Sequence, residues 1–223
     1  MVNLIPKPLE NETVNDQLLE ETNKVLGNGK KQGKKFAVLL CAEDSEYVKK
    51  KYEGYFGVFV RMLGEEGESW DVYRVAGNEF PNEKELGMYD GFVITGSCSD
   101  AHSNELWICK LLNLLKVLDS LKKKVLGICF GHQVLELPPQ VEVIGRSNKT
   151  SVEMFRYGEH MMGIQGHPEY NKDILLHLID RLLQKNFIVD TYANELRAKF
   201  MESRDPDKEA WRKLCVNFLK GKL

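Results

Sequence analysis

The sequence has few cysteines, no excess of either charge and no long hydrophobic run. Its 223 residues include 31 lysines plus arginines and 33 aspartates plus glutamates, a formal net charge of −2. This balance gives no electrostatic reason to expect a nucleic acid or an anionic membrane as a partner. No apolar stretch approaches the ~20 residues of a membrane-spanning helix. We therefore expect neither a nucleic-acid-binding protein nor a membrane protein.

The cysteine pattern gives no sign of a disulfide framework. The five cysteines stand at positions 41, 98, 109, 129 and 215 and form no C-x-x-C pair. An odd number with wide spacing in a chain of this length favours reduced thiols, and hence the cytosol. The histidines and cysteines also lack zinc-ligand spacing. We therefore expect no metal and no organic cofactor.

Two parts of the chain differ in composition. Residues 1–35 combine a short amphipathic stretch with a polar, glycine-rich linker, and we expect them to form an N-terminal extension. From residue 36 onward, apolar runs typical of buried strands alternate with helical patterns. Strands are expected at 36–42, 70–76, 91–95 and 125–128, and helices at 46–63 and 106–121. This order predicts a doubly wound, mostly parallel α/β sheet with helices on both faces.

After residue 133 the pattern changes. Short strands are expected at 141–144, 152–155 and 161–164, and residues 172–219 are mostly helical in pattern. A helix is expected after the predicted strand 125–128. Two prolines, Pro138 and Pro139, should end that helix after about two turns.

The most specific motif is Gly127-Ile128-Cys129-Phe130-Gly131-His132-Gln133, directly after a predicted strand. A strand, a small residue, a nucleophile, one residue, a second small residue and a helix make a nucleophile elbow. Such a turn presents Cys129 at the carboxyl end of the sheet, where α/β folds bind their ligands. The N–H groups and dipole of the following helix favour a thiolate. We interpret Cys129 as a nucleophile rather than an ordinary buried cysteine.

A base and its orienting group are offered by Gln165-Gly166-His167-Pro168-Glu169-Tyr170, which follows the predicted strand 161–164. His167 is expected to face Cys129, while Glu169 holds the second imidazole nitrogen. Oxyanion donors are expected at the N–H groups of Gly96 and Ser97, after the strand 91–95, and of Phe130, after the nucleophile.

Together these segments resemble the class I glutamine amidotransferase family. The marks are the elbow G-x-C-x-G-H-Q, the later G-H-P-E and an upstream glycine loop, in that order. The resemblance implies a flavodoxin-like fold over residues 36–223, with Cys129 as nucleophile, His167 as base and Glu169 as orienting acid. Within the family the sequence is most similar to plant γ-glutamyl peptidases, on the stretches 44–50, 89–97, 164–172 and 217–221.

That similarity implies a cytosolic enzyme that removes γ-glutamyl groups from glutathione conjugates or related γ-glutamyl peptides. It further implies a role in sulfur-containing defence metabolites such as glucosinolates. Two alternatives stay open: a glutaminase subunit that delivers ammonia to a synthetase, and an inactive family member that acts as a binding protein.

The chain departs from the family after residue 134. The family has a long stretch between the nucleophile and G-H-P-E, which carries several strands and part of the substrate pocket. Here 38 positions separate Cys129 from His167. The domain is therefore expected to be shortened after residue 134, which favours a loosely held substrate and low activity.

Overall fold

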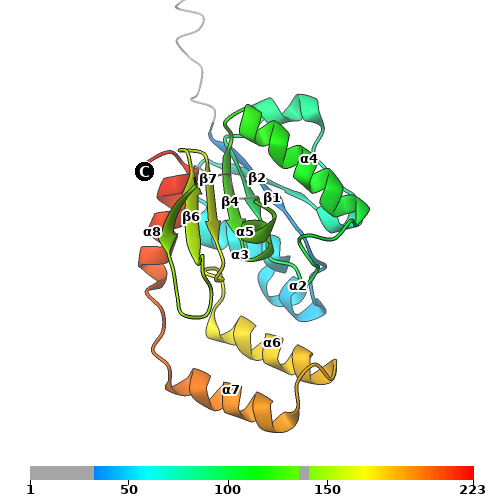
Figure 1. The fold of residues 1–223 in the computed structure, drawn as a ribbon, viewed down its shortest axis with the longest axis vertical. Helices are drawn as coiled ribbons and strands as arrows, with labels where there is room; N and C mark the ends of the chain where they lie inside the picture. The colour runs from blue at the N-terminus through cyan, green and yellow to red at the C-terminus, as the bar shows by residue number, and fades with distance from the viewer. Residues whose placement is uncertain (1–32, 136–140) are drawn as a thin grey trace, which may run out of the picture. The chain divides into compact units, whose positions relative to one another are not determined.

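The computed structural model describes residues 33–135 and 141–223 (Figure 1). The amphipathic helix and nearly all of the linker predicted within residues 1–35 therefore lie outside the described residues. The first strand begins at Lys35, one residue before the expected start of the domain.

A seven-stranded sheet in the described part of the chain has the order β2-β1-β3-β4-β7-β6-β5. The five strands from β2 to β7 pair in parallel, whereas β6 and β5 pair antiparallel. The mostly parallel sheet that the sequence predicts is thus confirmed. The strand bounds are β1 Lys35–Leu39, β2 Ser69–Tyr73, β3 Gly91–Ile94, β4 Lys124–Ile128, β5 Glu142–Gly145, β6 Met154–Tyr157 and β7 Met161–Ile164.

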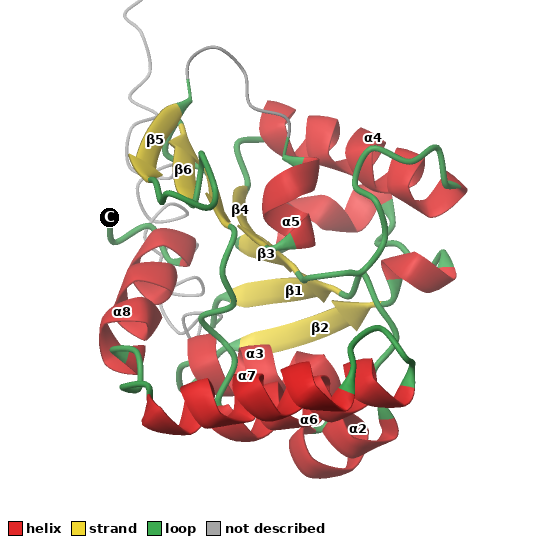
Figure 2. Cartoon of the chain, turned by 60° about the horizontal axis from the view of Figure 1, so that its bottom comes forward, coloured by secondary structure: helices red, strands yellow, loops and turns green. Residues whose placement is uncertain are grey.

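Helices cover both faces of the sheet (Figure 2). Successive residues of a strand point to opposite faces, so β1 sends Ala37 and Leu39 into one core and Phe36 and Val38 into the other. The first core is closed by α4 and α5, and the second by α3 and α8. The α-helices are α2 Glu46–Tyr52, α3 Gly54–Leu63, α4 Leu106–Ser120, α5 Phe130–Val134, α6 Lys172–Gln184, α7 Asp190–Glu202 and α8 Lys208–Leu219, with 3-10 turns η1 Val75–Gly77 and η2 Glu83–Met88.

The single helix expected at 46–63 is wrong, because two helices, α2 and α3, occupy this stretch. The break is at Glu53, whose φ of 62° lies in the left-handed region. Asp44 stabilises the new start, since its Oδ1 accepts a hydrogen bond from the Tyr55 N–H at 2.8 Å. A carboxylate that caps the first turn satisfies an otherwise unpaired donor.

The helix after Cys129 is shorter than expected. α5 spans five residues and ends at Val134, because Leu135 already has an extended backbone. The chain therefore leaves the helix before it reaches Pro138, and the prediction that the prolines end it is wrong. Val134 and Leu135 are both buried in the core shared with α4.

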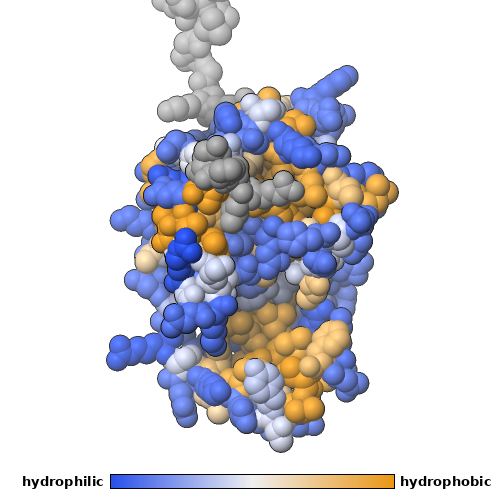
Figure 3. Space-filling view, in the orientation of Figure 1, coloured by the Kyte–Doolittle hydropathy of each residue, from blue (hydrophilic) through white to orange (hydrophobic). Residues whose placement is uncertain are grey.

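The C-terminal part of the chain divides into α6, α7 and α8. Where α6 and α7 lie, in the lower part of the view, Figure 3 shows apolar surface. The exposed large apolar residues of this hairpin are Leu182, Phe187, Val189, Tyr192 and Met201. No helix among the described residues has the length and apolar character needed to cross a membrane.

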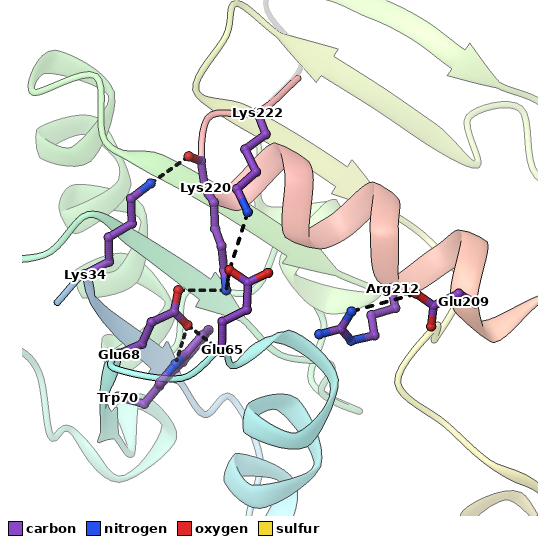
Figure 4. Close-up of polar contacts among 8 residues, drawn as sticks. All are labelled: Lys34, Glu65, Glu68, Trp70, Glu209, Arg212, Lys220 and Lys222. Atoms are coloured by element: carbon purple, nitrogen blue, oxygen red, sulfur yellow. Dashed lines mark hydrogen bonds and ion pairs between the residues drawn. The ribbon is translucent and has the colours of Figure 1, made fainter.

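A buried ion cluster ties α8 to the amino-terminal edge of the sheet (Figure 4). The Lys220 Nζ lies 2.7 Å from Glu68 Oε1 and 3.1 Å from Glu65 Oε2, and its side chain is 1% exposed. Lys34, which precedes β1, donates to the carbonyl of Lys220 at 2.7 Å. This cluster fixes one end of the sheet and leaves the carboxyl ends of the strands free.

Candidate active site

Cys129 occupies a strained turn between β4 and α5. Its φ of 53° and ψ of −103° lie in a region that residues other than glycine rarely adopt. Gly131 makes the turn possible, because a Cβ there would lie 2.5 Å from the carbonyl oxygen of Ile94 in β3. The local geometry is that of a nucleophile elbow at the carboxyl end of the sheet.

His167 and Glu169 form a hydrogen-bonded pair in the loop after β7. The His167 Nδ1 lies 2.7 Å from Glu169 Oε1, and the Glu169 side chain is only 1% exposed. The second carboxylate oxygen of Glu169 is buried and has no hydrogen-bond partner among the described residues. The imidazole is therefore the polar partner of this carboxyl group within the described chain, which fits an orienting role for Glu169.

The other side of the imidazole lies near Cys129, whose side chain acts to raise the pKa of His167. Gly96 lies against both residues: a Cβ at this position would be 2.7 Å from His167 Cε1 and 3.5 Å from Cys129 Cβ. The structure thus brings together the three residues predicted to form a triad, with Gly96 in direct contact.

Electrostatics favour the protonated form of His167. Burial opposes protonation, but the hydrogen bonds and negative charges of Cys129 and Glu169 outweigh it and raise the pKa of His167 to about 9. A protonated imidazole between a sulfur and a carboxylate is able to donate a proton to a leaving group at neutral pH.

The predicted oxyanion donors lie around the same turn. Gly96 and Ser97 follow β3, and Phe130 begins α5 and packs on Trp107, with ring centroids 5.4 Å apart. The N–H groups of Gly96, Ser97 and Phe130 donate to no acceptor among the described residues. They remain available to a ligand, and their role as oxyanion donors stays a prediction.

A pair of amide side chains links Cys129 to a cavity. The Gln165 Nε2 donates to Cys129 Sγ at 3.7 Å, and Gln133 Nε2 donates to Gln165 Oε1 at 3.2 Å. The cavity has a volume of about 600 Å³, within the range of pockets for small ligands. Its lining comprises His102, His132, Gln133, Leu135, Thr150, Ser151, Val152 and Gln165.

Cys129 is half-buried, and three of the four remaining cysteines differ from it in exposure. Cys41 and Cys215 are buried, and burial raises the pKa of both thiols, that of Cys215 to about 12. Cys98 is exposed and Cys109 is half-buried. No group of three or more His, Cys, Asp or Glu residues within the described chain is placed to hold a metal ion.

Sequence reasoning missed several residues of this site. His102 stands outside the motifs singled out in the sequence, yet it lines the cavity. Gln165 and Tyr170 stand in the same motif as His167, and the sequence predicts no role for either. In the structure Gln165 contacts Cys129, and the Tyr170 ring stacks on His167 at a centroid distance of 4.1 Å. The one available signal was their position in the same motif as His167.

Comparisons with known proteins find relatives of two kinds, γ-glutamyl peptidases and glutamine amidotransferases. The chain is 41% identical to γ-glutamyl peptidase 5 of Arabidopsis thaliana, over 85% of this chain and 96% of that protein. It is 40% identical to γ-glutamyl peptidase 3 of the same plant, over 85% of this chain and 98% of that protein. A glutamine amidotransferase from Thermotoga maritima shares the fold, with a TM-score of 0.60 and 17% identity over 85% of this chain and 99% of its own. No family model matches the chain.

The alignment with the first of these relatives also reveals a difference in length. It extends over 243 positions, whereas 85% of the 223 residues of this chain is about 190. About 53 positions of that alignment therefore have no residue in this chain. A domain shortened after residue 134 stays a prediction, and this difference supports it.

Proposed function

The chain belongs to the γ-glutamyl peptidase family, within the class I glutamine amidotransferases, and from this premise we propose that it hydrolyses the γ-glutamyl bond of glutathione conjugates or related γ-glutamyl peptides. The observation that carries the proposal is the contact of Cys129 with the buried His167–Glu169 pair at the carboxyl end of the sheet. A thiol beside an oriented imidazole is the arrangement for acyl transfer through a covalent intermediate.

In the first half of the reaction the Cys129 thiolate attacks the γ-carbonyl carbon. The electron pair of the C=O bond moves to oxygen, and the N–H groups of Gly96, Ser97 and Phe130 stabilise the negative charge. The carbon–nitrogen bond then breaks as His167 gives its Nε2 proton to the departing amine. A γ-glutamyl thioester remains on Cys129.

In the second half His167 must accept a proton. Thioester formation removes the negative charge by which Cys129 helps to raise the pKa of His167. Burial, the largest influence, then pulls this pKa down and favours the neutral imidazole. Neutral His167 takes a proton from water, which attacks the thioester carbon, the carbon–sulfur bond breaks and glutamate leaves.

The cavity beside Gln165 suits the peptide part of the substrate. Its described lining contains no carboxylate, lysine or arginine, and burial lowers the pKa of His132, which keeps that wall uncharged. Amide and hydroxyl groups of Gln133, Thr150 and Ser151 are able to hydrogen-bond peptide amides. We therefore assign this cavity to the amine side of the scissile bond.

The proposal also covers the cellular role of the protein. We propose a cytosolic reaction on glutathione conjugates that are precursors of sulfur-containing defence metabolites such as glucosinolates. The resemblance to plant γ-glutamyl peptidases supports this assignment, and the proposed chemistry requires no metal or organic cofactor.

The test compares substrates with purified protein and with Cys129→Ser as the control. Each protein is incubated with an S-alkyl glutathione, with glutathione and with glutamine, and free glutamate is measured by chromatography. The proposal predicts glutamate release from the S-alkyl glutathione that the serine variant lacks. Glutamate release from glutamine alone would instead identify a glutaminase. If none of the three substrates released glutamate, the result would favour the inactive binding protein.

A further inference from the structure

The four residues from His167 to Tyr170 form a tight turn. This turn brings the side chain of Tyr170 against that of His167. The Tyr170 N–H donates to the His167 carbonyl at 3.2 Å, and Pro168 occupies the second position. Proline suits this position because its fixed φ matches the turn. The third residue, Glu169, reaches back to His167 Nδ1 at 2.7 Å.

The Tyr170 ring lies flat on the imidazole of His167. The ring centroids are 4.1 Å apart and the planes differ by 5°. The other aromatic pairs of the described chain that join a tyrosine to a histidine are less parallel: Tyr47 and His177 differ by 18°, and Tyr157 and His160 by 54°. The stack at His167 is therefore the most closely parallel of these pairs.

Tyr170 is itself held by the helices behind it. Its ring packs against the small core of Val48, Val58 and Ile174, which joins α2, α3 and α6. Tyr55 of α3 lies beside it, with ring centroids 5.9 Å apart. The phenol ring is therefore a fixed surface against which the imidazole rests.

We propose that Tyr170 is a positioning residue, whose stacked ring holds the His167 imidazole in the plane that presents one nitrogen to Glu169 and the other to Cys129. This inference rests on the proposed function, since it concerns the same reaction. A hydrogen bond to Glu169 alone leaves the imidazole free to tilt about that bond. The Tyr170 face limits the tilt, and Gly96 limits movement at Cε1.

The stack also acts on the charge of His167. The face of a phenol ring is electron-rich and attracts a cation placed over it, so Tyr170 stabilises the protonated imidazole. The titratable groups around His167 are Cys129 after β4, Glu169 and Tyr170 in its own loop, Tyr55 on α3 and, behind Glu169, Cys215 on α8. Burial raises the pKa of Tyr170, which keeps its hydroxyl neutral over the working range.

The test measures the titration of His167 by NMR, which needs no substrate. Its Cε1–H signal is assigned by comparison with His167→Gln, and its midpoint is followed in Tyr170→Phe and Tyr170→Leu. Leucine fills the space without an aromatic face, so Tyr170→Leu should lower the midpoint by about 0.5–1 pH unit. Tyr170→Phe keeps the face and should change it by less than about 0.2 unit. Tyr157→Leu removes a tyrosine from a different histidine and should leave it unchanged.

Activity supplies a second readout. Tyr170→Leu should lower kcat about tenfold, with KM within about twofold of the wild-type value. Tyr170→Phe should have a kcat close to that of the wild type. Thermal unfolding establishes that each variant is folded, and Tyr170→Met replaces the leucine variant if that variant is not. An unchanged His167 midpoint in a folded Tyr170→Leu, or equal shifts in the leucine and phenylalanine variants, would overturn the inference. If the unaltered protein does not hydrolyse γ-glutamyl substrates, the proposed function is refuted. The NMR result would still decide the role of Tyr170.

Discussion

Gly96→Ala should slow the reaction strongly by displacing His167, although it adds only one methyl group. The new Cβ would lie 2.7 Å from His167 Cε1 and 3.5 Å from both His167 Nε2 and Cys129 Cβ. Ordinary contacts between carbon atoms are about 3.5–4.0 Å. The methyl group is therefore compatible with Cys129 and incompatible with the imidazole where it now lies.

The size of the effect follows from the distance that His167 must move. To reach ordinary contact, Cε1 must retreat by about 0.8–1.3 Å, while Nδ1 is held by Glu169 and the ring face by Tyr170. A misplacement of about 1 Å in a reacting group costs about 10²-fold in rate. We expect kcat of Gly96→Ala on an S-alkyl glutathione to fall by about that factor. The backbone N–H at position 96 is retained, so the loss would not come from a missing oxyanion donor.

Two further measurements separate this cause from others. The alkylation rate of Cys129 with iodoacetamide should also fall, because the thiolate loses its imidazolium partner. Gly87→Ala is the control, since a Cβ there meets nothing within 4 Å, and it should keep both rates. Wild-type turnover and alkylation by a folded Gly96→Ala would refute the placement of His167 against Cys129.

The remaining predictions test different parts of the account. Cys129→Ser should abolish turnover, and iodoacetamide should label Cys129 before Cys41 or Cys109; loss of activity with another cysteine labelled would reject Cys129 as nucleophile. Turnover needs protonated His167, so it should fall as pH rises through about 9, the raised pKa of this residue, and Glu169→Gln should move that limb to lower pH because it removes a group that raises the pKa. Glu169→Gln should also cost less than His167→Ala, which should remove about 10²–10⁴-fold of rate; negligible effects of both changes would reject the pair. Lys220→Met should lower the free energy of unfolding in urea by about 2–4 kcal/mol and leave kcat unchanged, because it strips the buried Glu68 of its cation on the edge of the sheet away from the site; an unchanged urea midpoint would contradict this.

The fold was predictable where burial alone decides the structure. The first strand and the strand before Cys129 are continuous apolar runs, which buried parallel strands require. Gly54, whose φ is 77°, is the one sequence signal for the break at Glu53, and the cap of α3 by Asp44, a residue outside the helix, was not predictable. The end of α5 at Val134 was also missed: Leu135 already has an extended backbone, and both residues are buried in the core shared with α4.

The candidate site shows the same division. The sequence motifs at this site each follow an apolar run, which indicates a strand followed by a turn. Their residues Cys129, His167 and Glu169 lie together in the structure. The contacts of Gln165 with Cys129 and of Tyr170 with His167 depend on side-chain directions that spacing does not encode. Gly96 looked like a possible oxyanion donor, and its steric role appears only when His167 lies against it.

The most direct test of the central claim is intact-protein mass spectrometry after a short incubation of the purified chain with an S-alkyl glutathione, followed by acid quenching. Attack by Cys129 predicts a mass increase equal to one γ-glutamyl acyl group. Peptide mapping should place it on Cys129, hydroxylamine should remove it, and Cys129→Ser should not show it. An unmodified chain under conditions in which glutamate is released, or an adduct on another residue, would contradict the account.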